Sequence, residues 1–284
     1  MKLGINTLLW TAGFNETHLS LFPRIKAWGF DGVEVATFAF DGFPARRIAQ
    51  AARDEGLDCT LCSALTGSLS LVGDDSAAAR DFLRHGIETA AEMETRLFVG
   101  PFCAPVGQLL GRRRTTDEWK RAVDGLSSLV PDLESHGITM AIEPLNRFET
   151  YFLNTIGDGV ELCKQVGSPR VALLYDSFHA NIEEKDPAAS FTTGAAHIAH
   201  VHTCENDRGI PGSGHVNWPH LFDAIRKAKY DDWLVIESFG FSIPEIAAAA
   251  CIWRDLAANA EDIASEGAKF LRDFLIDNPS TFCA

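Results

Sequence analysis

Four short apolar runs in the second half of the chain each end at a residue that can bind a metal ion. These runs end at Glu143, Asp176, His202 and Glu237. Apolar runs of this length are typical of strands that are buried on both faces, as in a parallel sheet. Functional groups gather at the carboxyl ends of such strands, so we expect the four side chains to lie at one edge of the sheet.

Three carboxylates and one imidazole form a suitable set of ligands for a divalent cation. Oxygen ligands with a single imidazole suit Mn²⁺, Mg²⁺ or Co²⁺ better than an ion that prefers thiolates. Asp176 alone is about as easily explained as a helix cap. Four such residues after four successive strands are much harder to explain by capping.

Strand and helix patterns alternate along the whole chain. Strands are expected at 2–6, 32–35, 58–62, 95–99, 139–142, 171–175, 198–202 and 233–237. Helices are expected at 19–28, 44–55, 76–92, 116–136, 156–166, 218–228 and after Pro244, and a short crossover around 187–193. Eight strand–helix units without a linker predict one domain over 1–284, an α/β fold of the (β/α)8 TIM barrel type with a C-terminal helical extension. A doubly wound open sheet is the alternative, but no Gly-x-Gly-x-x-Gly turn follows the first strand.

Composition excludes several partners. The chain has 284 residues with 39 Asp and Glu against 25 Lys and Arg, a net charge of −14, which disfavours nucleic-acid binding. The basic run at 112–114 is expected to be a solvated loop. We expect no membrane partner and no signal peptide, because no apolar stretch is long enough to span a bilayer and a strand pattern begins at the N-terminus.

The seven cysteines are scattered and odd in number, so they do not suggest a disulfide framework. A reducing, cytoplasmic location fits this pattern best. Cys59 and Cys62 have the spacing of a redox motif, but they lie in an apolar run without a second pair for zinc. We interpret them as two strand cysteines, and Ser76 as the cap of the helix at 76–92.

Histidines and a long loop add candidates near the strand ends. His179 follows Asp176 in what we expect to be a turn, where it is either a structural donor or a substrate contact. His200 and His202 point to one face of their strand, and His202, nearer the carboxyl end, is the expected ligand. His200 is expected to pack behind it. The segment 101–115 is either a substrate loop or lid, or a surface loop with no role in the site.

Several spaced motifs resemble the ketose 3-epimerases. They lie at 142–151, 176–179, 202–209, 214–218 and 236–237, and the resemblance is to the D-tagatose 3-epimerase and D-psicose (D-allulose) 3-epimerase group of the xylose-isomerase-like barrels. It implies a divalent cation, usually Mn²⁺, Co²⁺ or Mg²⁺, on Glu143, Asp176, His202 and Glu237. It further implies a homodimer or homotetramer, Glu143 and Glu237 as the proton-transfer pair, and contacts of a ketose substrate with Glu149, His179 and Arg208.

The chemistry of C3 epimerisation is consistent with these roles. The C3 proton of a ketose lies beside the C2 carbonyl, and its removal requires stabilisation of the resulting enediolate. Inversion needs one base on each face of a planar intermediate, which Glu143 and Glu237 from different strands can supply. Arg208 offers a rigid charged fork for substrate oxygens, unless it forms an ion pair with Glu205 or Asp207.

Other functions on the same barrel remain open. A hydroxypyruvate-isomerase-like enzyme would exchange aldehyde and ketone, and a keto-inositol dehydratase would release water. An endonuclease-IV-like repair enzyme is disfavoured by the acidic composition, and a sugar-binding protein would have no need of two carboxylates at one metal. The segment 6–9 lacks the aromatic residue that relatives place there, so the preferred ketose is left open.

Overall fold

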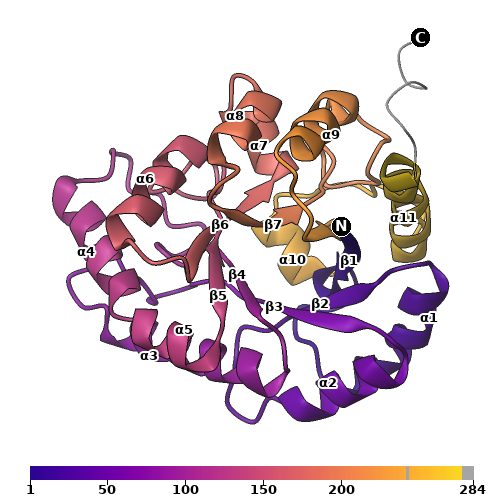
Figure 1. The fold of residues 1–284 in the computed structure, drawn as a ribbon, viewed down its shortest axis with the longest axis horizontal. Coiled ribbons are helices and arrows are strands. Elements are labelled where there is room, and N and C mark those ends of the chain that lie inside the picture. The colour runs from indigo at the N-terminus through magenta and orange to yellow at the C-terminus, as the bar shows by residue number, and fades with distance from the viewer. Residues whose placement is uncertain (241–242, 277–284) are drawn as a thin grey trace.

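Eight parallel strands pair in the order of the sequence, and β1 pairs with β8, which closes the sheet into a barrel (Figure 1). The computed structural model describes residues 1–240 and 243–276. The strands are β1 (Lys2–Asn6), β2 (Gly32–Ala36), β3 (Asp58–Cys62), β4 (Leu97–Gly100), β5 (Thr139–Ile142), β6 (Val171–Asp176), β7 (Ile198–His202) and β8 (Trp233–Ile236). The predicted (β/α)8 barrel is therefore confirmed.

The helices surround these strands, most of them as an outer ring and α10 nearer the centre of the view (Figure 1). They are η1 (Thr7–Leu9), η2 (Glu16–Leu21), α1 (Phe22–Ala27), α2 (Ala45–Asp54), α3 (Ala77–Glu92), α4 (Thr116–Ser127), α5 (Val130–His136), α6 (Ile156–Val166), α7 (Ser177–Glu183), α8 (Pro187–Gly194), α9 (Trp218–Lys227), α10 (Pro244–Ala249) and α11 (Ala260–Ile276). The C-terminal helix α11 packs against β1 and β8 and completes the ring. None of the described helices is long and apolar enough to cross a bilayer.

Alternation along the strands decides which side chains enter the barrel. Ala141, Leu174 and Val235 belong to the apolar cluster inside the sheet, whereas their strand neighbours pack outward against the helices. Because side chains two residues apart share a face, residues 143, 176 and 237 point into the same interior. The strand pattern thus directs carboxylates to the centre of one barrel mouth.

Prolines explain two differences from the predicted helices. The helix expected at 116–136 is two helices, since α4 ends at Ser127 and α5 has Pro131 in its first turn. A proline within a helix lacks the N–H and clashes with the carbonyl four residues earlier, which here is that of Ser127. The helix expected at 19–28 is likewise a 3₁₀ helix followed by α1, with Pro23 in the first turn of α1.

Some local predictions need correction. Ser76 precedes α3 but its side chain makes no cap; instead the carboxylate of Asp75 accepts a hydrogen bond from Ala77 N at 3.0 Å. Cys59 and Cys62 are both in β3 and free, as expected. The last cysteine of the sequence, Cys283, lies outside the described residues.

Arginines fix the segment 101–115 to the neighbouring helices. Arg112 donates to both carboxylate oxygens of Glu118 at 2.8 and 2.9 Å. Arg114 donates to Asp158 at 2.9 Å and stacks its guanidinium over the ring of Trp119. The basic run lies in a loop in which Arg112 and Arg113 are exposed, as expected, and Arg112 and Arg114 also pair with carboxylates of α4 and α6.

Candidate active site

The four residues at the strand ends come together in the barrel mouth. Asp176 and His202 are the last residues of β6 and β7, and Glu143 and Glu237 follow β5 and β8 directly. All four are buried, and one ligand atom from each lies within 4.8 Å of those of the others. The arrangement brings together the side chains that the sequence placed on separate strands.

The cluster has the donor set and the unsatisfied atoms that a metal ion requires. His202 Nδ1 lies 3.3 Å from Glu237 Oε2, 3.8 Å from Asp176 Oδ2 and 3.9 Å from Glu143 Oε1. His202 Nδ1 and Glu143 Oε1 are buried and make no hydrogen bond. Buried polar atoms without a partner are costly, and a cation between these groups would satisfy both. The residues therefore fit a divalent metal ion.

Asp176 serves two purposes with its two carboxylate oxygens. Oδ1 caps α7 by accepting hydrogen bonds from Phe178 N at 2.6 Å and His179 N at 3.4 Å. Oδ2 faces the cluster. Asp176 can therefore cap α7 with one oxygen and still offer the other oxygen to a metal ion. The cap also places His179 in the first turn of a helix, which corrects the turn expected at this position.

Arg208 lies inside the cluster and not at its edge. Its Nη1 donates to Asp176 Oδ2 at 2.9 Å and to Glu237 Oε2 at 3.1 Å. The guanidinium is sandwiched between the rings of Phe178 and Phe239, with centroid distances of 4.1 and 4.8 Å. Its backbone φ of +66° lies in the left-handed region, which is uncommon for a residue other than glycine.

The alternative partners considered for Arg208 are engaged elsewhere. Glu205 accepts hydrogen bonds from Trp218 Nε1 at 2.9 Å and from backbone N–H groups of the same loop. Asp207 forms an ion pair with Arg254 at 3.1 Å. The alternative prediction of an ion pair between Arg208 and Glu205 or Asp207 is therefore wrong. The charged guanidinium of Arg208 points into the candidate site instead.

Asn146 connects two of the expected substrate contacts. Its backbone N–H donates to His179 Nδ1 at 3.0 Å, and its Nδ2 donates to Glu149 Oε1 at 2.7 Å. His179 Nε2 in turn lies 3.4 Å from Glu143 Oε1. A role for Asn146 was not predicted from the sequence, although Asn146 lies within the motif at 142–151 that contains Glu149.

Burial and neighbouring charges separate the pKa values of these groups. Burial, assisted by the charge of Glu237, raises the pKa of Glu143 well above its ordinary value. Burial acts in the same direction on Asp176, but Arg208, His179 and His202 together outweigh it and lower the pKa of that carboxyl. Burial lowers the pKa of His179 to about 3, so its imidazole is neutral. Unequal carboxyl pKa values are a common property of sites that transfer protons.

Glu34 and Asn6 are buried polar residues that the sequence analysis missed. Glu34 lies in the middle of β2 and reaches both histidines of β7, at 2.8 Å from His200 Nε2 and 2.7 Å from His202 Nε2. Asn6 donates to Glu34 Oε1 at 2.9 Å. A signal existed, because Glu34 interrupts an otherwise apolar strand. The expected position of His200 behind His202 agrees with these contacts.

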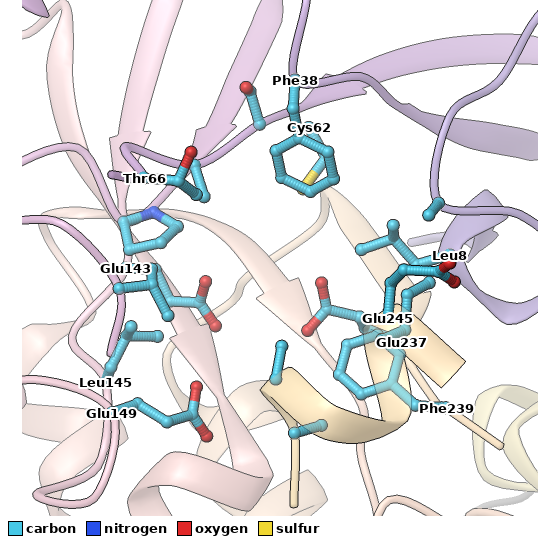
Figure 2. A pocket seen from close by; sticks show the side chains of 18 of the residues that line it. Leu8, Phe38, Cys62, Thr66, Glu143, Leu145, Glu149, Glu237, Phe239 and Glu245 are labelled. Carbon is cyan, nitrogen blue, oxygen red and sulfur yellow. The ribbon is translucent and has the colours of Figure 1, made fainter. Parts of the chain in front are cut away.

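A cavity of about 390 Å³ opens beside the cluster. In Figure 2 the carboxylates of Glu143 and Glu237 face each other across it, and Glu149 points into it from the same side as Glu143. Much of the remaining lining is apolar and includes Leu8, Phe38, Val106, Phe239 and Ile246. Val106 belongs to the segment 101–115, which therefore lines the cavity. The cavity is polar where the four strand ends meet and apolar beyond them.

This geometry defines a sugar isomerase or epimerase of the TIM-barrel class. Residues 22–274 match the family model described as Xylose isomerase-like TIM barrel. A protein of Synechocystis sp. named a probable ketose 3-epimerase is 37% identical, with 96% of each chain covered. The chain belongs to this barrel family and, within it, to the ketose 3-epimerases, which are isomerases acting on sugars.

Solved structures agree with this assignment. A structure of L-ribulose 3-epimerase superposes with a TM-score of 0.92 at 27% identity and covers 96% of this chain and 94% of that one. A structure of D-psicose 3-epimerase in the presence of D-fructose gives a TM-score of 0.87 at 26% identity, with 96% and 97% covered.

Proposed function

We propose that the protein epimerises free ketoses at C3, with one divalent metal ion per subunit held by Glu143, Asp176, His202 and Glu237. The observation that carries the proposal is the pair of buried glutamates that face each other across the cavity (Figure 2). Mn²⁺ suits this oxygen-rich set best, followed by Co²⁺ and Mg²⁺. When bound, such an ion acts as a Lewis acid and stabilises negative charge on the substrate oxygens.

The two glutamates divide the proton transfer. One carboxylate removes the proton from C3 on one face of the ketose, which leaves a planar enediolate. The carboxyl group on the other face then returns a proton to C3, and the configuration inverts. Glu143 follows β5 and Glu237 follows β8, so they reach the cavity from different sides. For the reverse reaction the two residues exchange roles.

Three further residues hold the polar end of the sugar. Arg208 presents its guanidinium to the cavity, with one side held by Asp176, and it is suited to bind substrate oxygens in a fixed geometry. His179 is neutral and Glu149 is oriented by Asn146, so both can form hydrogen bonds to sugar hydroxyls. These contacts restrict where C3 lies relative to the two glutamates.

The relatives support C3 epimerisation over the other reactions of this barrel. The three relatives described above are named as 3-epimerases, and neither hydroxypyruvate isomerisation nor keto-inositol dehydration needs a base on each face of C3. The expected homodimer or homotetramer and a cytoplasmic location, which suits the free cysteines, belong to the same proposal.

Proton exchange in heavy water tests the proposal directly. The metal-loaded protein is incubated with D-fructose, D-psicose, D-tagatose and L-ribulose, and C3 is followed by NMR. We expect deuterium at C3 together with the C3 epimer, and the rates rank the four sugars. Absence of label at C3 in every ketose, with the metal bound, would contradict the proposal and direct attention to hydroxypyruvate and the keto-inositols.

A further inference from the structure

Glu34 occupies an unusual place for a carboxylate, because it lies wholly inside the barrel below the candidate metal site. Its side chain is inaccessible to solvent. It extends from β2, whereas the histidines it contacts are on β7, and these two strands do not pair. The contact therefore crosses the interior of the barrel and joins its two halves directly beneath the cluster.

Each oxygen of Glu34 has two polar partners. Oε1 accepts from Asn6 Nδ2 at 2.9 Å and lies 2.7 Å from His202 Nε2. Oε2 accepts from Thr60 Oγ1 at 2.9 Å and lies 2.8 Å from His200 Nε2. The carboxylate is thus held from both sides and cannot turn without breaking a buried hydrogen bond.

The orientation of Asn6 is fixed independently of Glu34. Its Oδ1 accepts a hydrogen bond from Leu8 N at 2.9 Å, so its Nδ2 has to face Glu34, and the same Nδ2 lies 3.4 Å from Glu237 Oε1. With Asn6 as a donor on Oε1, this oxygen is available to His202 as an acceptor. His202 consequently places its N–H at Nε2 and directs the Nδ1 lone pair toward the cluster.

We propose that Glu34 is a positioning residue that sets the ring orientation and the tautomer of His202 for metal binding. The inference rests on the metal site of the proposed function, but not on the sugar or on the proton transfer. The free-energy cost of burying the Glu34 carboxylate argues against a purely structural role for this residue. A buried carboxylate is expensive, and an apolar side chain of similar volume commonly packs there as well or better. Carboxylates behind metal-bound histidines typically raise metal affinity about 10–100-fold.

Metal titration of the stripped protein tests this role without measuring turnover. Mn²⁺ affinity is measured by competition with a chromophoric chelator for the wild type, Glu34→Gln, Glu34→Ala and Thr60→Val. We expect the affinity to fall about 10–100-fold in Glu34→Ala and less in Glu34→Gln, whose amide oxygen can still accept from His202. Thr60→Val removes a bond from the other oxygen of Glu34, and is expected to stay close to the wild type.

Two further readouts separate positioning from general loosening. Urea unfolding of the metal-free proteins reports stability, and the visible absorption of bound Co²⁺ reports ligand geometry. A changed Co²⁺ spectrum in Glu34→Ala but not in Thr60→Val supports the inference. Wild-type affinity and spectrum in both Glu34 variants would overturn it, as would affinity losses that simply follow the stability losses of all three variants. If Glu34→Ala does not fold, Glu34→Met, which fills a similar space but offers His202 no carboxylate acceptor, decides between the same outcomes. Failure of the wild type to bind Mn²⁺ would instead contradict the proposed function.

Discussion

His202 Nδ1 and Glu237 Oε2 lie 3.3 Å apart across the ends of two neighbouring strands, and the imidazole nitrogen makes no hydrogen bond. The nitrogen is buried, and the carboxylates of Asp176 and Glu143 are at 3.8 and 3.9 Å from it. Arg208 pairs with Asp176 and Glu237, but Glu143 Oε1 and His202 Nδ1 are buried without a hydrogen bond, which is unfavourable unless a further cation binds there. The local geometry therefore predicts that metal occupancy strengthens the fold.

Metal removal tests this expectation. A ligand that binds only the native state stabilises it by about 2.7 kcal/mol at a hundredfold excess over its Kd. We expect chelation to lower the thermal midpoint and abolish epimerisation, and added Mn²⁺ to restore both. The measurement is thermal unfolding of the stripped protein with increasing Mn²⁺. A midpoint independent of Mn²⁺ would argue against a metal in this cluster.

Glu237→Gln tests the proton-transfer pair. The amide keeps the shape of the side chain but cannot exchange a proton at C3, so we expect C3 inversion to fall about 10²–10⁴-fold. Inversion is followed by NMR with the best ketose, and bound metal is quantified in the same samples. Glu245→Gln is the matched control, because Glu245 lines the same cavity from the exposed helix α10. An equal loss of C3 inversion in Glu237→Gln and Glu245→Gln would contradict the role of Glu237 in proton transfer.

Glu118 predicts a pH dependence of stability. The hydrogen bonds from Arg112 hold its pKa at about 2, below the ordinary value of 4.5. A lowered carboxyl pKa stabilises the fold above the ordinary value, and this stability is lost as the pH falls from about 4.5 toward 2. We expect Glu118→Gln to lower the free energy of unfolding by about 1–3 kcal/mol near neutral pH.

Urea unfolding of Glu118→Gln and the wild type at about pH 7 and about pH 3 provides the measurement. The difference between the two proteins should shrink at the lower pH, because at about pH 3 the Glu118 carboxyl group is mostly protonated in the unfolded chain but still mostly ionised in the folded protein, where its pKa is about 2. A constant difference would mean that the ion pair with Arg112 does not account for the stabilisation.

Gly100 predicts a strict steric requirement beside the site. Its φ is +143°, and a Cβ atom there would lie 1.9 Å from the carbonyl oxygen of Ser63. Its own carbonyl accepts a hydrogen bond from Glu143 N at 3.0 Å. We expect Gly100→Ala to destabilise the protein by about 3 kcal/mol or more, through backbone strain and displacement of β3 or β4.

Gly13→Ala is the control for Gly100→Ala, since no atom lies within 4 Å of its added Cβ and its φ is not positive. Both variants are compared with the wild type by urea unfolding. Comparable stability of all three proteins would show that the strand β4 can shift to accept a side chain.

The barrel and its four strand-end residues were predictable because they depend on local patterns. Apolar runs predict the strands, and the alternation of side chains along each strand predicts which of them point into the barrel. The carboxyl ends of all parallel strands lie at the same end of the barrel. The break between α4 and α5 was also readable from Pro131, although the long apolar periodicity obscured it. Glu34 was not predicted, because the strand pattern alone does not reveal that a charged residue faces histidines on the far side of the barrel.

The environment of Arg208 depends equally on tertiary structure. Its neighbours in sequence, Glu205 and Asp207, were the obvious partners, but its side chain pairs with Asp176 at the end of β6 and Glu237 just after β8. Likewise, Arg114 pairs with Asp158, which is 44 residues away. Such long-range ion pairs follow from the closure of the barrel and not from any local signal.

The candidate catalytic residues and much of the apolar lining of the cavity come from different parts of the barrel. The four strand-end residues come from β5 to β8, whereas three of the apolar lining residues, Leu8, Phe38 and Val106, follow β1, β2 and β4; Phe239 and Ile246 complete the lining from the segment after β8. Loops of the first half can therefore be exchanged to accommodate sugars of different length or stereochemistry while the reacting groups keep their positions. For protein engineering, the loops after β1, β2 and β4 are therefore the segments to vary, and the residues at the ends of β5 to β8 are the ones to keep.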